Sequence, residues 1–234
     1  MEQLLECPRV DRRTLRTRKA LREALAEEIT ATGDLSQVTV TAVADRAGIT
    51  RRTFYSHYAD IPALVDAVED EAVNDLSALV KSISTVTLDE LERSLSQFAP
   101  CPGSEEVLLY FKDNDHLAAL LGEGGDPAFA EKLKTMVREV VQVRASEGFT
   151  PAANSPIARS VFDYYLTFVI SAEVGVVVRW LSTGAQESVA VMSRLMTALL
   201  FVRPGDLYGR PVDFDIAALA ETAGAIAKEF NHVC

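Results

Sequence analysis

The chain of 234 residues has few of the side chains that bind metals, form disulfides or move protons. Its three cysteines, Cys7, Cys101 and Cys234, are widely spaced and odd in number, and no pair has the spacing of metal ligands. This pattern predicts free thiols in a reducing cytoplasm rather than a disulfide framework. The first thirteen residues contain no apolar run long enough for a signal peptide. We therefore expect a cytoplasmic protein.

Strand-like alternation of period two is also rare, which predicts an all-α fold. The chain is 48% hydrophobic, enough to fill a substantial core, and long enough for one small and one larger domain. We predict an N-terminal domain over residues 1–60 and a larger helical domain over residues 61–234. No internal repeat is apparent.

Groups suited to catalysis are scarce. The histidines are His57, His116 and His232, and no nucleophile–base pairing can be assembled from their spacing. Asp113 and Asp115 flank His116 closely, but a solvated loop is favoured there over a metal site. Residues 122–127 (GEGGDP) lack the spacing of a phosphate-binding loop, which favours a turn. The sequence predicts no enzyme, no metal and no cofactor.

Residues 38–58 (VTVTAVADRAGITRRTFYSHY) predict two short helices joined by a tight turn. Thr39 suits the N-cap of the first helix and Thr50 that of the second. Gly48 supplies the conformational freedom that the turn needs. Arg51 and Arg52 would then lie on an exposed helix start, where they suit phosphates and guanine edges. This is the pattern of a helix-turn-helix that binds the DNA major groove.

The flanking segments and the charge distribution favour the same function. A basic helix is predicted over Arg13–Ile29 and ends at Gly33, and Asp60 caps a long helix predicted over Ile61–Ile83. Residues 1–58 hold 10 Lys and Arg against 8 Asp and Glu, whereas the rest of the chain holds 13 against 26. A basic unit on an acidic body approaches a polyanion with one face.

These segments resemble the N-terminal domain of TetR-type (tetracycline-repressor-like) regulators over roughly residues 13–68. The resemblance rests on Thr17-Arg18, Ala20-Leu21, Ala24-Leu25, Gly33, Val38-Thr39-Val40, Val43-Ala44, Ala47-Gly48-Ile49, Thr53-Phe54-Tyr55, His57-Tyr58 and Ala63-Leu64. Ile61 stands where the family commonly has a lysine, so one contact to the DNA backbone is expected to be absent.

We expect the DNA-binding residues to lie on the first helix and on the two helices of the motif, with Arg51 and Arg52 at base edges. They are Thr17, Arg18, Thr39, Arg51, Arg52, Thr53, Tyr55 and His57. Phe54 should instead be buried. The expected target is double-stranded DNA with two-fold symmetry, and repression is expected from the family resemblance.

After residue 83 the periodicity predicts helices over Leu88–Phe98, Glu106–Phe111 and Leu117–Leu121, a long helix from Pro127 to about Ser146, and a last one over Phe214–Phe230. Pro156–Thr183 is apolar nearly all round, which is typical of a core or membrane helix. The mid-run Glu173 favours the core and an interface over a membrane.

Together with Gln186–Phe201, the helix at Pro156–Thr183 predicts a two-fold symmetric four-helix dimer interface, as the resemblance also implies. The candidate interface residues are Val176, Trp180, Leu195 and Leu199. A monomer with these helices as its core is the alternative.

The resemblance also implies a helical body that encloses a small-molecule effector. The apolar and aromatic candidates for a mostly apolar or planar ligand are Leu79, Val80, Ile83, Phe98, Tyr110, Phe111, Leu120, Phe129, Phe162, Tyr165 and Phe168. Small anionic ligands are disfavoured by the acidic body unless Arg138, Arg144 or Arg159 turns inward. A DNA-anchored scaffold that recruits a protein and, as a third hypothesis, an α-helical enzyme remain open.

Overall fold

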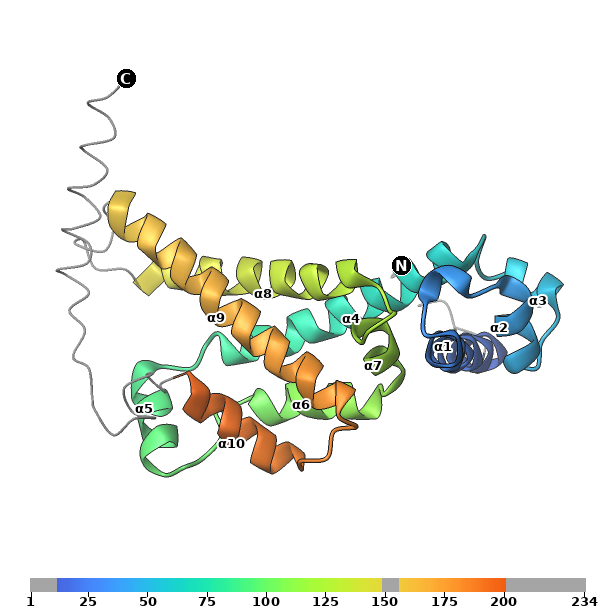
Figure 1. Cartoon of the computed structure of the whole chain (residues 1–234). Coiled ribbons are helices and arrows are strands. Elements are labelled where there is room, and N and C mark those ends of the chain that lie inside the picture. Colours follow the sequence, from blue (N-terminus) through green and yellow to red (C-terminus); the bar gives the residue numbers. More distant parts are fainter. Residues whose placement is uncertain (1–11, 149–155, 201–234) are drawn as a thin grey trace, which may run out of the picture. The chain divides into compact units, whose positions relative to one another are not determined.

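The computed structural model describes residues 12–148 and 156–200, and every regular element in these ranges is a helix (Figure 1). The elements are α1 (Arg12–Thr32), η1 (Leu35–Gln37), α2 (Val40–Arg46), α3 (Arg51–Tyr55), α4 (Ile61–Ile83), α5 (Leu88–Ser96), α6 (Ser104–Asp113), α7 (His116–Leu121), α8 (Pro127–Gly148), α9 (Pro156–Ser182) and α10 (Val189–Leu199). The predicted all-α fold is confirmed for this part of the chain. The predicted helix over Phe214–Phe230 lies outside the described residues, as do Cys7, Cys234 and His232.

The helix ends in the N-terminal part follow the local rules that predicted them. Gly33 ends α1 with φ of 70°, and Gly48 makes the turn between α2 and α3 with φ of 66°. Both are left-handed conformations that glycine adopts without strain. At the start of α4, the Asp60 carboxylate accepts a hydrogen bond from the backbone amide of Ala63 (2.8 Å). The predicted bounds of α4, Ile61–Ile83, are confirmed.

The chain divides into two compact units, and each unit consists of two segments that are separate in the sequence. The first unit comprises the residues up to 74 together with 113–130, and the second comprises 75–112 and the residues from 131 onward. The short helix α7 therefore packs with the N-terminal helices, although it comes between two helices of the other unit. The predicted functional division near residue 60 stays a prediction.

Helix α1 is the centre of the first unit, where it packs against α2, η1 and α7. Its stripe of Leu21, Leu25 and Ile29 is fully buried, as are Leu117 and Leu120 of α7. Burial of each such side chain contributes roughly 1.5–3 kcal/mol. Apolar packing therefore fixes α7 to α1.

The glycine turn after α7 adds a backbone contact to this packing. The amide of Leu35 donates a hydrogen bond to the carbonyl oxygen of Gly124 (2.7 Å). A Cβ on Gly124 would come within 2.1 Å of the Gly33 carbonyl oxygen, so the two backbones meet closely. The predicted turn at residues 122–126 is confirmed, and it contacts the segment that follows α1.

His116 was predicted to lie in a solvated loop, and the structure differs from this prediction. It begins α7 and is partly buried within the first unit. Burial, and next the nearby guanidinium of Arg22, lower the pKa of His116. The helix forms there because Leu117, Leu120 and Leu121 have an apolar surface to pack on.

In the second unit, α10 packs against α5. The backbone amide of Cys101 donates a hydrogen bond to Thr197 Oγ1 (2.8 Å), which joins the turn before α6 to α10. The Trp180 ring is only 2% exposed, and its Nε1 donates to the Glu187 carbonyl oxygen (3.2 Å). These contacts fix the turn between α9 and α10.

Helix α9 is long and apolar enough to cross a membrane by length and composition alone. Residues Arg159–Ser182 have a mean hydropathy of 1.6 in their most apolar window, and only 17% of that window is buried. Its large exposed rings are Tyr164, Tyr165 and Phe168. Most residues of this window are thus not buried by the described part of the chain.

Candidate functional site

The turn between α2 and α3 is held by two side-chain caps. Thr39 Oγ1 accepts a hydrogen bond from the amide of Ala42, and Thr50 Oγ1 accepts one from the amide of Thr53, both at 3.2 Å. The predicted N-caps are therefore confirmed. Each cap fixes the first turn of its helix and so fixes the direction of the side chains that follow it.

Phe54 anchors α3 in the apolar core of the first unit. Its ring is 0% exposed, and its centroid lies 5.7 Å from that of Tyr55 and 6.1 Å from that of Tyr58. Val43 and Ala44 of α2 are buried as well. Since the Phe54 ring is fixed in the core, α3 cannot rotate about its axis, and the same side chains always face solvent.

Arg51 and Arg52 are exposed, on the first turn of α3. Neither forms an ion pair among the described residues, whereas Arg46 binds Glu27 and Glu28 (3.0 and 2.5 Å). The Glu28 carboxylate, and next that of Glu27, raise the pKa of Arg46. The motif thus neutralises the arginine at the end of α2 and leaves the two at the start of α3 unpaired.

The other predicted DNA contacts lie near the same helices. Tyr55 is 58% exposed, and Thr53 and His57 are half-buried. On α1, Arg18 is exposed, and Thr17 Oγ1 donates to the carbonyl oxygen of Arg13 (3.0 Å). These positions are open to a polyanion, and their contacts with DNA stay a prediction.

The predicted effector residues differ in exposure in the described part of the chain, and two pairs of their rings lie near each other, Tyr110 with Phe111 (centroids 6.1 Å apart) and Phe162 with Tyr165 (6.4 Å). Phe98, Tyr165 and Phe168 are 78%, 54% and 72% exposed, whereas Phe111 and Phe129 are buried in different units. The remaining candidates are half-buried or buried; they are Leu79, Val80, Ile83, Tyr110, Leu120 and Phe162. The contact of these residues with an effector stays a prediction.

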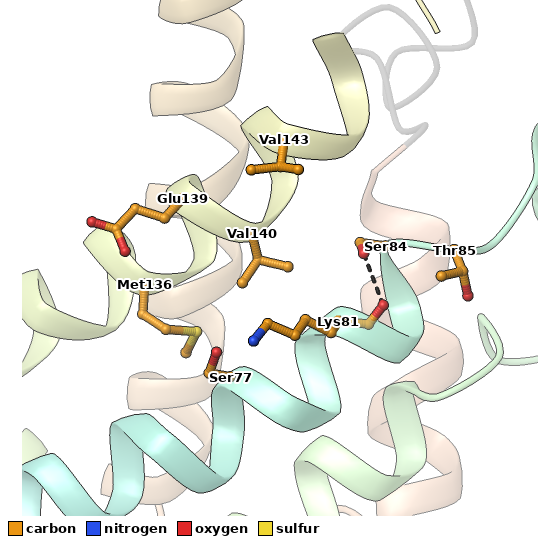
Figure 2. A pocket seen from close by; sticks show the side chains of 8 residues that line it. All are labelled: Ser77, Lys81, Ser84, Thr85, Met136, Glu139, Val140 and Val143. Carbon is orange, nitrogen blue, oxygen red and sulfur yellow. Dashed lines mark hydrogen bonds between the residues drawn. The ribbon is translucent and has the colours of Figure 1, made fainter. Parts of the chain in front are cut away.

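A cavity of about 540 Å³ lies elsewhere in the second unit, between α4 and α8 (Figure 2). Its lining residues are Ser77, Lys81, Ser84, Thr85, Met136, Glu139, Val140 and Val143. None of them belongs to the predicted effector set. The helical spacing of 77, 81 and 84 and of 136, 140 and 143 was visible in the sequence, but nothing there showed that the two stripes face each other.

The candidate dimer residues differ in exposure. Leu195 and Leu199 of α10 are exposed, and Val176 of α9 is half-buried. Trp180 is covered by its own chain, so it has little surface to offer a second subunit. The exposed leucines and the exposed rings of α9 are the surface that a partner could cover.

Clustered metal ligands are not found in the part of the chain that the structure describes. One of the three arginines considered for an anionic ligand, Arg138, binds Asp163 Oδ1 (2.6 Å) and donates to Thr167 Oγ1. Both partners belong to α9, so this arginine links α8 to α9.

Two family models match the chain. One, described as bacterial regulatory proteins of the tetR family, matches residues 24–68, and the other, a transcriptional regulator C-terminal region, matches residues 100–201. An uncharacterised HTH-type transcriptional regulator, YxbF of Bacillus subtilis (strain 168), is 29% identical over 90 residues, which are 37% of this chain. The chain matches about a quarter (24%) of that relative's length.

Two solved structures have the same fold. The fatty acid degradation regulator FadR from Bacillus halodurans has a TM-score of 0.53 at 13% identity, covering 81% of this chain and 95% of its own. The regulator FadR from Bacillus subtilis, solved in complex with stearoyl-CoA, has a TM-score of 0.53 at 13% identity, covering 80% of this chain and 96% of its own. At this identity the likeness concerns the fold.

Proposed function

Because the chain belongs to the TetR family of transcriptional regulators, we propose that it is a cytoplasmic, homodimeric repressor that a small molecule releases from its operator. Residues 1–60 would bind DNA, and residues 61–234 would bind the effector and the second subunit. The effector would act by favouring a spacing of the two DNA-binding units that no longer fits successive major grooves, about 34 Å apart.

The observation that carries DNA binding is the exposed start of α3. Arg51 and Arg52 are exposed and unpaired among the described residues, while Phe54 on the same helix is fully buried. A rigid helix with free guanidinium groups can place them against guanine edges, which accept bidentate hydrogen bonds. This combination supports a recognition helix.

Selection of binding sites from a random DNA library tests this role. The wild type should select a two-fold symmetric site, and Arg52→Ala should weaken binding by about 1–3 kcal/mol and relax the preference at one base pair in each half-site. The control Arg93→Ala, on exposed α5, should select the wild-type site with unchanged affinity. Equal weakening for all sequences would make Arg52 a phosphate contact, and failure to select any site would refute the proposed function.

The exposed apolar surface of α9 and α10 supports a dimer. Leu195 and Leu199 are exposed large apolar residues, and most of α9 is uncovered. Surfaces of this kind mark partner or membrane contacts. A second copy covers both helices at once by two-fold symmetry, in an interface on the order of 2,000 Å² for an obligate dimer.

Sedimentation at micromolar concentration tests the assembly. The wild type should have about twice the chain mass, and the double variant Leu195→Glu/Leu199→Glu should be monomeric because it buries charge at the interface. Leu109→Glu is the control, since Leu109 is equally exposed (45%, as is Leu195) but lies on α6. A monomeric wild type that floats with lipid vesicles would favour a membrane contact instead.

The identity of the effector is proposed from the fold neighbours. Since the neighbour from Bacillus subtilis was solved with stearoyl-CoA, acyl-CoA thioesters are the first compounds to test. Addition of the effector should dissociate the protein from its selected DNA site. The alternative is a DNA-anchored scaffold whose exposed α9–α10 surface recruits a different protein; it is favoured if no small molecule changes DNA affinity.

A further inference from the structure

The cavity between α4 and α8 has the size of a small-molecule site. At about 540 Å³ it lies within the range of roughly 300–1,000 Å³ that is usual for such sites. All its lining residues belong to the second unit. Its position on α4 matters, because α4 is one continuous helix whose residues up to 74 belong to the first unit.

The two walls of the cavity differ in chemistry. On α8, Met136, Val140 and Val143 follow one another at helical spacing and form an apolar wall. The opposite wall is polar and comes from the end of α4 and the turn after it. It consists of Ser77, Lys81, Ser84 and Thr85. A ligand that fits both walls is an amphiphile.

Lys81 gives the polar wall its charge. Figure 2 shows its side chain extending into the gap between α4 and α8, toward Ser77 and Met136. Lys81 forms no ion pair with any residue that the structure describes. Glu139 is the one acidic residue in the lining, and its carboxylate points away from Lys81 in Figure 2.

The hydroxyl groups beside Lys81 are already oriented by the backbone. Ser84 Oγ donates to the carbonyl oxygen of Lys81 (2.8 Å), and Thr85 Oγ1 donates to that of Ser82 (2.7 Å). The protons of Ser84 and Thr85 are therefore used, and the Lys81 ammonium, with the Ser77 hydroxyl beside it, is left as the charged donor for a ligand anion. An ammonium donates up to three hydrogen bonds and accepts none.

We propose that this cavity is the effector site, and that it binds an amphiphile whose carboxylate or phosphate contacts Lys81 while its hydrocarbon chain lies along Met136, Val140 and Val143. The role of the ligand as an effector rests on the proposed function. The binding of the ligand in this cavity does not. It also revises the expectation from the acidic composition, because one lysine provides the local positive charge that the overall charge lacks.

Calorimetry on the full chain without DNA tests the site. Dodecanoate, dodecyl phosphate and lauroyl-CoA, each below its micellar concentration, represent the possible anions, and dodecanol is the uncharged match. We expect at least one anion to bind about tenfold or more tightly than dodecanol, as a charge-assisted hydrogen bond requires. The ranking of the three anions shows whether the site prefers a carboxylate, a simple phosphate or a coenzyme A thioester.

Three variants separate the two walls. Lys81→Met should lower anion affinity about tenfold or more and leave dodecanol binding unchanged, whereas Lys81→Arg should keep most of the affinity. Val140→Trp should fill the cavity and weaken all four ligands. Lys112→Met, on the exposed end of α6, is the matched control and should bind like the wild type.

Equal anion binding by wild type and Lys81→Met would overturn the proposal, as would binding of dodecanol as tightly as every anion, or no binding at all. These outcomes are independent of DNA. If Lys81-dependent binding occurs but leaves the affinity for the selected DNA site unchanged, the site stands and the effector role fails. If DNA binding fails while Lys81-dependent binding occurs, the proposed function fails alone.

Discussion

Among the described residues, nearly all large apolar side chains of the first unit are covered, whereas many of those in the second unit are exposed. Among the described residues of the first unit, only Leu15 and Tyr55 are large apolar side chains that stay exposed. Those exposed in the second unit are Phe98, Leu109, Val143, Tyr164, Tyr165, Phe168, Val191, Leu195, Leu199 and Leu200. Among the described residues, the large apolar side chains that a partner could cover therefore lie mainly in the second unit.

The cause of this difference is the distribution of apolar residues around each helix. Helix α1 has one apolar stripe, at Leu21, Ala24, Leu25 and Ile29, and its neighbours cover that stripe. Helix α9 is apolar nearly all round. Helices that pack on one side of it leave apolar residues on its other sides exposed. A single apolar stripe can be covered by one layer of neighbouring helices, whereas a helix that is apolar nearly all round cannot.

Removing the ring of Phe54 should have the largest effect. Phe54→Ala should cost about 3–5 kcal/mol, because the ring is fully buried and leaves a cavity. The loss should be confined to the first unit. Urea unfolding followed by far-ultraviolet circular dichroism measures it. The fluorescence of the chain's single tryptophan, Trp180 on α9, reports the second unit separately and should show an unchanged transition.

Phe98→Ala is the matched control in the second unit, since that ring is 78% exposed. We expect a change within about 0.5 kcal/mol. If Phe54→Ala shifts the Trp180 transition as much as the circular dichroism, the two units unfold together and the comparison fails. A large effect of Phe98→Ala would show instead that a partner covers this ring.

The backbone contact between Gly33 and Gly124 should have the next largest effect. Gly124 has φ of 83°, and a Cβ there would overlap backbone atoms of Gly33. Gly124→Ala should therefore cost more than the roughly 1–2 kcal/mol of left-handed strain alone. It should also remove protection from hydrogen exchange at the Leu35 amide, which donates to the Gly124 carbonyl.

Gly184→Ala separates strain from overlap. Gly184 has a similar φ of 80°, but a Cβ there meets nothing within 4 Å. It should show the strain cost alone and leave Leu35 protected. Equal destabilisation by the two variants would mean that the turn after α7 moves freely, and α7 would then not be fixed to the first unit.

Much of the first unit could be predicted from the sequence because short-range rules decide its helix ends. Thr39 and Thr50 act as N-caps, and Gly33 and Gly48 take the left-handed turns that the pattern requires. The burial of Phe54 follows from its large apolar ring, two positions after Arg52 and so on the other side of the helix. Each of these features depends on residues within four positions along the chain.

The cavity and the packing of α7 could not be predicted in this way. Lys81 and Val140 are 59 positions apart, and neither is unusual for its own helix. The residues 122–126 were correctly predicted as a turn, but nothing local showed that Gly124 meets Gly33. Several aromatic residues of the second unit lie on its surface, which their positions along the chain did not show either. Contacts between distant segments decide both features.

An effect that appears only as the pH is changed concerns Glu173, a carboxyl within the apolar helix α9. Burial raises the pKa of Glu173 from its ordinary 4.5 to about 7. Between these two values the folded chain keeps this proton and the unfolded chain releases it. The free energy of unfolding of the second unit should therefore fall as the pH rises through this window, by about 1–3 kcal/mol.

Glu173→Gln should remove this fall, because its amide does not ionise. The variant should match the wild type near pH 4.5 and be more stable by about 1–3 kcal/mol at pH 8, as measured by urea unfolding followed through Trp180 fluorescence. Glu92→Gln, at an exposed position on α5, should keep the pH dependence of the wild type. If Glu173→Gln also loses stability over this range, the carboxyl is hydrated in the folded protein. The inner side of α9 would then be as open as its outer side, and the second unit would be even less complete on its own than its exposed rings indicate.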